Sequence, residues 1–471
     1  MTDGLGLEDV YGATIVRIQA QGGDKPRLGM GALMWISHVE RPLTPIELCQ
    51  ALAIDLGSTD FNASNIPSIT TLVGCCQGLI TMDKEASTGR LVHFTLREYL
   101  SAHPGIFGRP HSAIAELCLT YLNYQQVKDL SASSFAHLSA IIHDKPFLEY
   151  CSLYWGIHAK KEHSERAESL ALQLLQDYDG HISAILLIRE LLYHLPEGSN
   201  NLLFSGLHCA SHFGIIGVVA SLIAMGGYDL NEGDSCERTA LSFAAMQGHE
   251  DVVKILLERE EVNPNKPNYY GATPVLSAAL RGHEGVVKML LEREEATPDN
   301  PNQNGVTPLM SAASKGHEGV VKILLEHEGV NPDKSDHNGK TPLSHAAEGG
   351  YPGVVKILLE REEVNPDKPD NYGATPLMSA VEKGHEGVAK ILLEREEVNP
   401  DKPNNYGATP LMSAAKKGHE EVVKILLVRE EVNPNKPDRF GRTPLTLATL
   451  SCRQSVIALL RSRKAITHSW E

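Results

Sequence analysis

The chain has 471 residues, of which 42% are hydrophobic and 22% are charged, as in a folded soluble protein. This length exceeds what one hydrophobic core supports, so we expect several domains. The net charge of −16 is shared evenly between the two halves, and no lysine- or arginine-rich run interrupts it. The charge therefore argues against nucleic-acid binding and against attachment to an anionic membrane.

Cysteine usage and the first residues indicate a cytoplasmic protein. The eight cysteines form no CxxC pair and no disulfide-like framework, which is typical of a reducing compartment. The start, MTDGLGLEDVYG, lacks the basic and apolar segments of a signal peptide. No uninterrupted apolar stretch reaches the roughly 18 residues that a membrane helix needs.

The first hundred residues have the pattern of a helical segment followed by a small domain of helices and a hairpin. Residues 5–21 have helical spacing, within a first segment of residues 1–27. Further helices are predicted at 28–36, after the capping residue Thr44, and at 67–76. The β-prone runs GLITMD and RLVHF predict a hairpin. Three helices and a hairpin indicate a winged-helix-like domain over residues 28–103.

Helical spacing returns from His111 to about Tyr193, as in IAELCLTYL and SAILLIRELLYHL. It predicts a helical domain over residues 104–198. The sequence PEGSN, at 196–200, is the strongest linker signal in the chain.

A repeat of 34 residues fills the segment 199–471. Threonines recur at this interval from Thr239 to Thr443, six of the seven are followed by proline, and glycines keep the same step. Each unit predicts a short helix, a tight turn at the glycine and a second helix, with apolar faces that only neighbouring units can cover. The residues expected to specify this solenoid are Thr273, Pro274, Gly282, Thr307, Pro308, Gly316, Thr341, Pro342, Thr375, Pro376, Gly384, Thr409, Pro410 and Gly418.

The pattern T-P-L-x-x-A-A, then G-H, then V-V-K-x-L-L, then V-N resembles the ankyrin repeat. The resemblance covers about 270 residues and implies about eight units, of which the last looks like a C-terminal cap. The expected fold is mainly α: a winged-helix-like and helical N-terminal region followed by an ankyrin-repeat α-solenoid. The family implies protein recognition through a concave surface.

The N-terminal segments GLEDVYGATIVRI, GLITMD and LVHFTLREYL resemble the region that follows the NACHT nucleotide-binding module of fungal NOD-like receptors. In that family the region links an NTPase to C-terminal repeats. An NTPase needs a GxxxxGK[ST] loop, and the near match Gly339-Lys340-Thr341 lacks the first glycine and falls at a repeat turn. We therefore expect the NTPase to be missing from this chain.

The histidines suggest two functional sites, and we prefer a structural interpretation of both. His93 matches a histidine that contacts nucleotide in the resembled receptors; without an NTPase we favour a packed structural side chain. The histidines at 249, 283, 317, 385 and 419 recur with the repeat. Neighbouring helices are about 8–10 Å apart, too far to share a zinc ion at about 2 Å from each nitrogen. We predict hydrogen bonds between successive turns instead.

Other chemistry has little support. The winged helix shows no basic recognition helix, which argues against DNA binding. No Ser/His/Asp or Cys/His pattern recurs in a suitable context, so we expect no enzymatic activity, no cofactor and no metal. We interpret the EREE runs as solvated helix ends, and the PDKP sequences as turns that their prolines stiffen.

The expected partner-binding residues lie on the turn before each first helix and on that helix itself. They are the aromatic residues Tyr270, Tyr372, Tyr406 and Phe440, the methionines Met310, Met378 and Met412, and the lysines Lys383 and Lys417. Aromatic and methionine side chains are common at protein interfaces. Packing of the aromatics against neighbouring turns is an equally good interpretation.

The leading hypothesis is a non-enzymatic protein-binding chain, the sensor part of a fungal NOD-like receptor that lacks its NTPase. One alternative is a stand-alone cytoplasmic scaffold or adaptor. The other is a signalling component whose NTPase is supplied by another chain. The residues specify neither the partner protein nor an oligomeric state.

Overall fold

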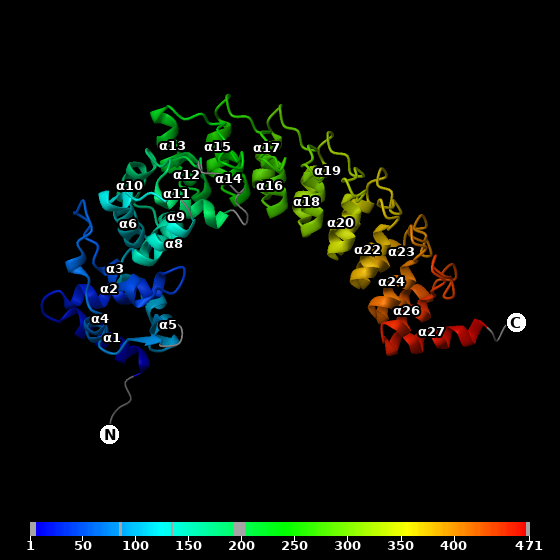
Figure 1. Cartoon of the computed structure of the whole chain (residues 1–471), viewed down its shortest axis with the longest axis horizontal. Helices are drawn as coiled ribbons and strands as arrows, with labels where there is room; N and C mark the ends of the chain where they lie inside the picture. Colours follow the sequence, from blue (N-terminus) through cyan, green and yellow to red (C-terminus); the bar gives the residue numbers. More distant parts are fainter. Residues whose placement is uncertain (1–5, 84–86, 133–134, 192–202, 468–471) are drawn as a thin grey trace, which may run out of the picture. The chain divides into compact units, whose positions relative to one another are not determined.

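The computed structural model describes residues 6–83, 87–132, 135–191 and 203–467. The chain divides into two compact units, residues 1–235 (unit 1) and 236–471 (unit 2) (Figure 1). The linker predicted at 196–200 lies outside the described residues. The first helix pair of the repeat region belongs to unit 1, so this compact unit extends beyond the predicted boundary at 198.

Unit 1 begins with the predicted helices and hairpin: α1 Leu7–Gln19, α2 Lys25–His38, α3 Pro45–Leu52, the 3-10 turn η1 Ala63–Asn65, α4 Ile69–Cys75, β1 Ile80–Asp83 and β2 Thr88–Leu91. The two strands pair antiparallel, with Ile80 opposite Leu91. Thr44 caps α3 as predicted, because its hydroxyl accepts the Glu47 N–H at 3.2 Å while the Glu47 carboxylate accepts the Thr44 N–H at 2.7 Å. Helices α2, α3 and α4 pack together, and β2 packs on α2 and α3, which confirms the winged-helix prediction.

The predicted helical region continues unit 1. It follows α5 Phe94–Ala102, which ends the predicted winged-helix domain. Its elements are the 3-10 turn η2 Pro104–Ile106, α6 Pro110–Asn123, α7 Gln125–Lys128, α8 Phe135–Asp144, α9 Phe147–Lys161, α10 Glu165–Leu175 and α11 Ile182–Leu191. The first helix pair of the repeat region, α12 Gly206–Phe213 and α13 Ile216–Met225, completes unit 1. One aromatic cluster joins this bundle to the winged helix. The buried ring of Trp35, on α2, lies 5.6 Å from Phe147 and 5.8 Å from Tyr150, both on α9. The two regions therefore share a hydrophobic core.

The helix pair α12 and α13 rests on α9 and α10. The Phe213 ring, on α12, lies 5.2 Å from the Trp155 ring. It covers Gly156, where a Cβ atom would fall 2.1 Å from the phenylalanine ring. Glycine is needed at this position because any side chain would displace Phe213 from its site.

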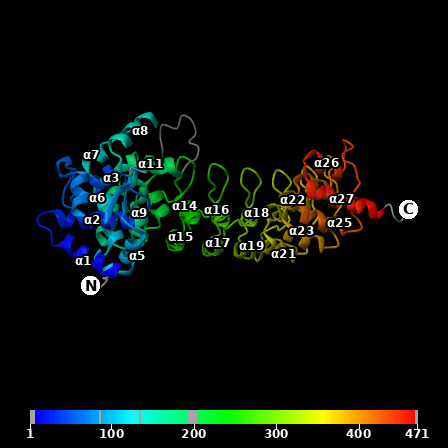
Figure 2. The ribbon, with the colours of Figure 1, turned by 90° about the horizontal axis from the view of Figure 1, so that it is seen from below.

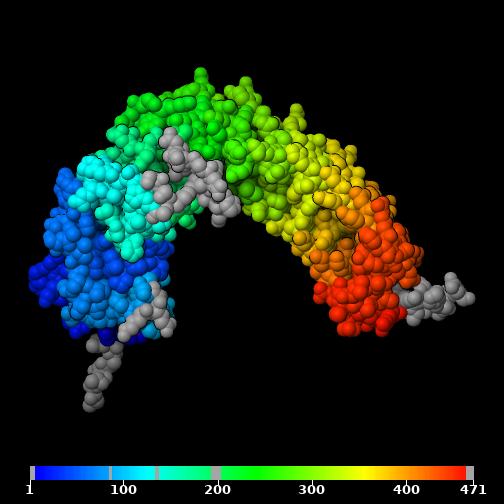
Figure 3. All heavy atoms as spheres, viewed as in Figure 1, coloured from blue at the N-terminus to red at the C-terminus, as the bar shows by residue number. Residues whose placement is uncertain are grey.

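Unit 2 consists of seven further helix pairs within its described residues: α14 Ala240–Gln247 and α15 Glu250–Leu257, α16 Pro274–Arg281 and α17 Glu284–Leu291, α18 Pro308–Lys315 and α19 Glu318–Leu325, α20 Pro342–Gly349 and α21 Pro352–Leu359, α22 Pro376–Lys383 and α23 Glu386–Leu393, α24 Pro410–Lys417 and α25 Glu420–Leu427, and α26 Pro444–Leu450 and α27 Gln454–Thr467. Successive pairs stack side by side and form a continuous packed body (Figure 3). With α12 and α13 they make eight pairs, as predicted.

Loops join the second helix of each pair to the first helix of the next pair, and we call them fingers. The finger of residues 360–375, for example, joins α21 to α22. The fingers of unit 2 follow one another along one edge of the stacked helices (Figure 2). The turn at residues 370–374 is the tip of this finger, and equivalent turns occur in the other fingers.

The repeated threonine, proline and glycine fix the first helix of each pair. Thr375 has an extended backbone, and its Oγ1 accepts the Met378 N–H at 3.3 Å, so it caps α22. Pro376 occupies the first helical position, where no backbone N–H is required. Gly384 ends the helix in the left-handed conformation, with φ of +82°. Equivalent threonine, proline and glycine residues act in the same way in α16, α18, α20 and α24.

The repeated histidines hydrogen-bond between successive turns, as predicted. His419 Nε2 donates to the backbone oxygen of Glu382 at 3.0 Å, and His385 Nε2 to that of Glu348 at 3.0 Å. The same contact joins His283 to Met246 and His317 to Leu280. Each ring also lies over the turn glycine of the preceding pair, so the histidine packs two units together.

Candidate recognition surface

Each finger tip is a tight turn that a side-chain oxygen closes by accepting two backbone N–H groups. Asp370 Oδ1 accepts the N–H groups of Tyr372 and Ala374, at 2.9 and 2.8 Å, and Gly373 has φ of +81°. A side-chain acceptor that closes its own turn in this way makes an Asx-type turn. Asn268, Asn302, Asp336, Asn404 and Asp438 make the same two contacts at the other tips.

Neighbouring tips are also joined to each other. The Asn405 N–H donates to the backbone oxygen of Tyr372 at 2.9 Å, and the Asn371 N–H donates to that of Asn338 at 2.9 Å. The same contact recurs from Gln303 to Tyr270, from His337 to Asn304 and from Arg439 to Tyr406. Side-chain amides add to these contacts: Asn371 Nδ2 donates to the backbone oxygen of His337 at 2.9 Å, and Asn405 Nδ2 to that of Asn371 at 3.0 Å. Hydrogen bonds of the backbone and of these amides therefore join the tips, without a contribution from the aromatic rings.

The predicted aromatic residues stand at these tips with their side chains largely in solvent. Tyr270, Tyr372, Tyr406 and Phe440 are exposed by 52, 57, 54 and 69%. Tyr269 adds a second ring beside Tyr270, at 5.4 Å between centroids, and Arg442 lies over the Phe440 ring at 4.8 Å. The aromatic residues form two groups, one at Tyr270 and one over the last three tips, separated by the tips of Asn304 and Asn338.

The predicted methionine contacts are wrong. Met310, Met378 and Met412 are buried, with at most 3% of each residue exposed. They occupy the third position of their helices, where each backbone N–H bonds to the capping threonine, and their side chains pack into the core between helix pairs. Methionine fills protein cores as readily as it lines interfaces. Its recurrence at this position of the repeat therefore did not distinguish a core residue from an interface residue. These side chains cannot touch a partner and are not part of the candidate surface.

Lys383 and Lys417 lie on the surface, at the C-terminal ends of α22 and α24. Each ammonium pairs with a glutamate one unit earlier: Lys383 with Glu348 at 3.6 Å and Lys417 with Glu382 at 3.3 Å. About half of each lysine side chain remains exposed. Such pairs contribute little to stability, which leaves the lysines available to a partner.

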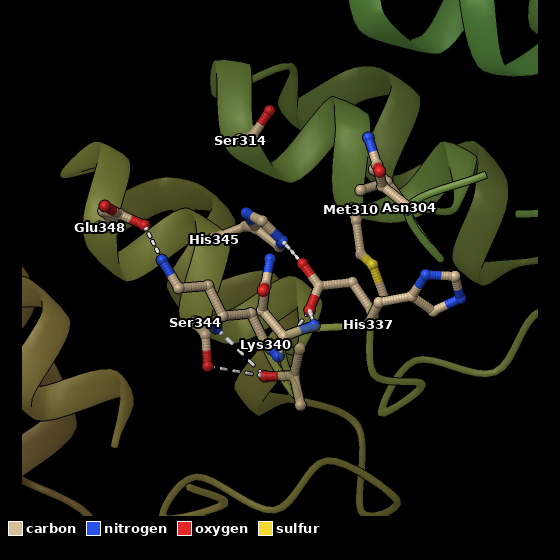
Figure 4. A network of polar contacts seen from close by, with 12 residues as sticks. Asn304, Met310, Ser314, His337, Lys340, Ser344, His345 and Glu348 are labelled. Carbon is tan, nitrogen blue, oxygen red and sulfur yellow. Dashed lines mark hydrogen bonds and ion pairs between the residues drawn. The ribbon is translucent and has the colours of Figure 1, made fainter. Parts of the chain in front are cut away.

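A polar network at the centre of unit 2 was not predicted. Asp336 is buried, and its Oδ2 accepts a hydrogen bond from His345 Nε2 at 3.1 Å (Figure 4). Beside it, Lys340 Nζ contacts Glu348 Oε2 at 2.6 Å. The Lys340 ammonium, by this hydrogen bond, holds the pKa of the Glu348 carboxyl below its usual value against the opposing effect of burial.

The sequence did contain a signal for this network, because its unit departs from its neighbours at two positions. Where this unit has Lys340, the units on either side have Val306 and Ala374, although the first and last units of the series have Arg238 and Arg442. Where it has His345, other units have Ser277, Ser311, Ser379 and Ser413. The two tips between Tyr270 and Tyr372 have asparagine in place of an aromatic residue, and the charged and hydrogen-bonding network lies in this part of the sequence.

The remaining candidates have structural roles. Gly339 forms a finger tip with φ of +82°, and Thr341 caps α20, so the Gly339-Lys340-Thr341 sequence is a repeat turn. His93 is exposed, and the prediction of a packed side chain is wrong. Its Nδ1 accepts the Thr95 N–H at 3.3 Å and thereby caps α5. The N-terminus of α5 faces solvent, and the histidine that caps it is therefore exposed.

None of the helices in the described part of the chain combines the length and the apolar character needed to cross a lipid bilayer.

Comparison with known protein families gives two matches. A family described as Ankyrin repeats (3 copies) matches residues 207–302, 294–370, 327–404 and 396–468. A family described as GPI inositol-deacylase, winged helix domain matches residues 18–110, and this winged helix is of the type that follows NACHT modules. A comparison with curated proteins gives no match.

Proposed function

The chain belongs to the ankyrin-repeat family, and from this premise we propose that it recognises a partner protein through the finger tips and the adjoining ends of the first helices. The supporting observation is the row of aromatic side chains that are more than half exposed on tips held by backbone hydrogen bonds. Large rigid rings on a fixed frame lose little conformational entropy when they bind. They are therefore suited to act as anchors in an interface.

The charges in the units of the last three tips indicate the chemistry of the partner. Lys383, Lys417, Lys416 and Arg439 are exposed and belong to the same repeat units as Tyr372, Tyr406 and Phe440. The second helices carry acidic first turns instead, such as Glu420 and Glu421 on α25. A partner segment that combines acidic and apolar residues would match the tips and would be repelled by the second helices.

The biological role that we propose is non-enzymatic and cytoplasmic: the sensor part of a fungal NOD-like receptor. The winged helix of the post-NACHT type supports this role, because it precedes the repeats along the chain as it does in those receptors. A stand-alone scaffold or adaptor remains the alternative. A signalling component that works with an NTPase on another chain is the third candidate.

A double substitution, Tyr372→Ala with Tyr406→Ala, tests the recognition surface. Proximity labelling in the source cells, with the intact chain as bait, should show a loss of the specific partner of about tenfold or more, as for aromatic anchors of an interface. Val428→Ala is the matched control, since Val428 is a 76% exposed apolar residue at the end of α25, away from the tips. Retention of the partner by the tip variant, or equal loss with the Val428 variant, would contradict the proposal.

The thermal melt of the same variants separates recognition from packing. Loss of two exposed rings should change the melting temperature by no more than about 2 °C, because substitutions of exposed side chains are close to neutral in stability. A large fall in melting temperature would assign the rings to packing between fingers. A NACHT-coding frame directly upstream in the gene would favour the receptor role over the scaffold.

A further inference from the structure

Two histidines and a glutamate converge in unit 1, and none of them belongs to the recognition surface. His111 lies on α6, His158 on α9, and Glu40 follows the C-terminal end of α2. One ligand atom from each residue, two imidazole nitrogens and a carboxylate oxygen, lies within 4.8 Å of the others. The two histidine Nδ1 atoms face each other at 2.7 Å.

The other side of His158 is fixed. Its Nε2 contacts the Tyr150 hydroxyl at 2.9 Å, and the same hydroxyl accepts the Glu40 N–H at 3.2 Å. Metal-binding histidines usually have their second nitrogen held by such a contact, which sets the orientation of the ring. His158 is fully buried, so its Nδ1 cannot turn toward water.

Both imidazoles are held in the neutral form that binds metals. Burial, together with the neighbouring His111, Lys161 and His38, lowers the pKa of His158 to about 3. Burial also lowers the pKa of His111. A lowered pKa favours the neutral imidazole, which is the form that binds a metal ion.

We propose that His111, His158 and Glu40 form a binding site for a divalent transition-metal ion such as Zn²⁺, with water as the fourth ligand. Imidazole nitrogens with one carboxylate are a common zinc donor set. Tetrahedral zinc bonds of about 2.0–2.1 Å place two nitrogens about 3.3 Å apart, so the rings need to separate by about 0.6 Å from their present contact.

The Glu40 carboxylate already has an ion-pair partner, with which a metal ion would compete. Its Oε1 accepts from Lys161 Nζ at 2.5 Å. Metal binding would transfer the carboxylate from the ammonium to the ion, and Lys161 would turn into solvent, where nearly half of its side chain already lies. The nearby Glu162 uses its Oε2 to accept the backbone N–H of Ser112 at 2.9 Å.

The proposed site would link separate parts of unit 1. Glu40 follows the helix α2 of the winged-helix core, whereas His111 and His158 belong to the helical bundle. A metal ion would tie these segments together and stabilise the folded unit in proportion to the logarithm of its concentration. The simpler alternative is a pair of histidines that share one proton and bind no metal.

Titration of the chelator-treated full chain with Zn²⁺ and with Co²⁺ tests the proposal. The wild-type chain should bind one equivalent more than the His111→Ala variant, with tetrahedral Co²⁺ absorption and a melting temperature that rises with metal concentration. His143→Ala controls for adventitious surface binding, because the His143 side chain is 91% exposed and outside the site. This control should bind as the wild type does.

Two further variants keep the test decisive. Glu40→Gln should weaken the affinity for Zn²⁺ by about tenfold or more without disturbing the buried histidine. Lys161→Met should tighten it severalfold, because the carboxylate is then free and a positive charge is removed. Equal binding by the wild type, His111→Ala and Glu40→Gln would overturn the proposal and leave the two histidines as a hydrogen-bonded pair.

Discussion

Lys402 joins two neighbouring fingers: its Nζ donates to the backbone oxygen of Asp367 at 2.8 Å and to its Oδ2 at 2.9 Å. The contact recurs between Lys334 and Asp299, Lys368 and Asp333, and Lys436 and Asp401. The repeated sequence PDKP thus contains a ladder of contacts between units, in addition to the prolines that were expected to stiffen each finger.

Removal of one step of this ladder should destabilise unit 2. We expect Lys402→Met to lower the free energy of unfolding by about 1 kcal/mol, less than the usual contribution of a hydrogen bond to a charged group, because a third of the lysine side chain is exposed. Lys424→Met is the control, since its pairs lie within α25 and are exposed. Urea unfolding followed by circular dichroism measures both, and equal losses would contradict a special role for the ladder.

Two glycines of the same repeat unit, Gly384 and Gly387, should respond oppositely to substitution by alanine. Gly384→Ala forces a left-handed alanine and places Cβ 2.7 Å from the His419 ring, so we expect a loss of about 1–3 kcal/mol. A methyl group added at Gly387, in α23, would have no atom within 4 Å, and Gly387→Ala should gain up to about 1 kcal/mol. Thermal melts of the two variants provide the comparison, and a change of the same sign in both would contradict it.

The burial of Met378 and the exposure of Tyr372 predict separate effects on stability and binding. Met378→Ala should cost about 2–4 kcal/mol, because it leaves a cavity between helix pairs. Tyr372→Ala should cost less than about 0.5 kcal/mol, because the ring is mostly in solvent. Chemical denaturation measures both losses, and similar values for the two variants would contradict the assignment of one to the core and the other to the surface.

Unit 1 should lose stability in weak acid because of His181. Burial lowers the pKa of this histidine from 6.5 to about 4 in the folded chain. Between these values the unfolded chain binds a proton that the folded chain does not, so the stability present above pH 6.5 falls as the pH drops toward 4. His181 should contribute about 1.4 kcal/mol per pH unit to the slope, in addition to the contribution of His158, whose pKa burial also lowers.

Tryptophan fluorescence reports this transition, because Trp35 and Trp155 are both buried in unit 1. The third tryptophan, Trp470, is best replaced by phenylalanine in the background chain. His181→Asn retains an acceptor for the Ser183 N–H, which His181 Nδ1 now accepts at 3.1 Å. Its unfolding free energy should fall less between pH 6.5 and 4; an unchanged slope would show that other groups cause the acid sensitivity.

The sequence alone determined the elements whose information is local and repeated. Threonine, proline and glycine at 34-residue intervals each act within one turn of chain, through a cap, a first helical position or a left-handed φ. Repetition made these signals unambiguous, and the helix pairs, their number and the spacing of the aromatic tips followed from them. The capping of α3 by Thr44 was predictable for the same reason.

Only the tertiary structure decided which side chains face solvent and which distant residues meet. Met378 and Tyr372 lie close together in the sequence, and their burial depends on the neighbouring helix pair, which no local pattern encodes. The Lys402 contact spans 35 residues, and the His111 contact with His158 spans 47. Such contacts form only when the chain folds and its helices and fingers pack together. The spacing of the residues along the sequence therefore does not predict them.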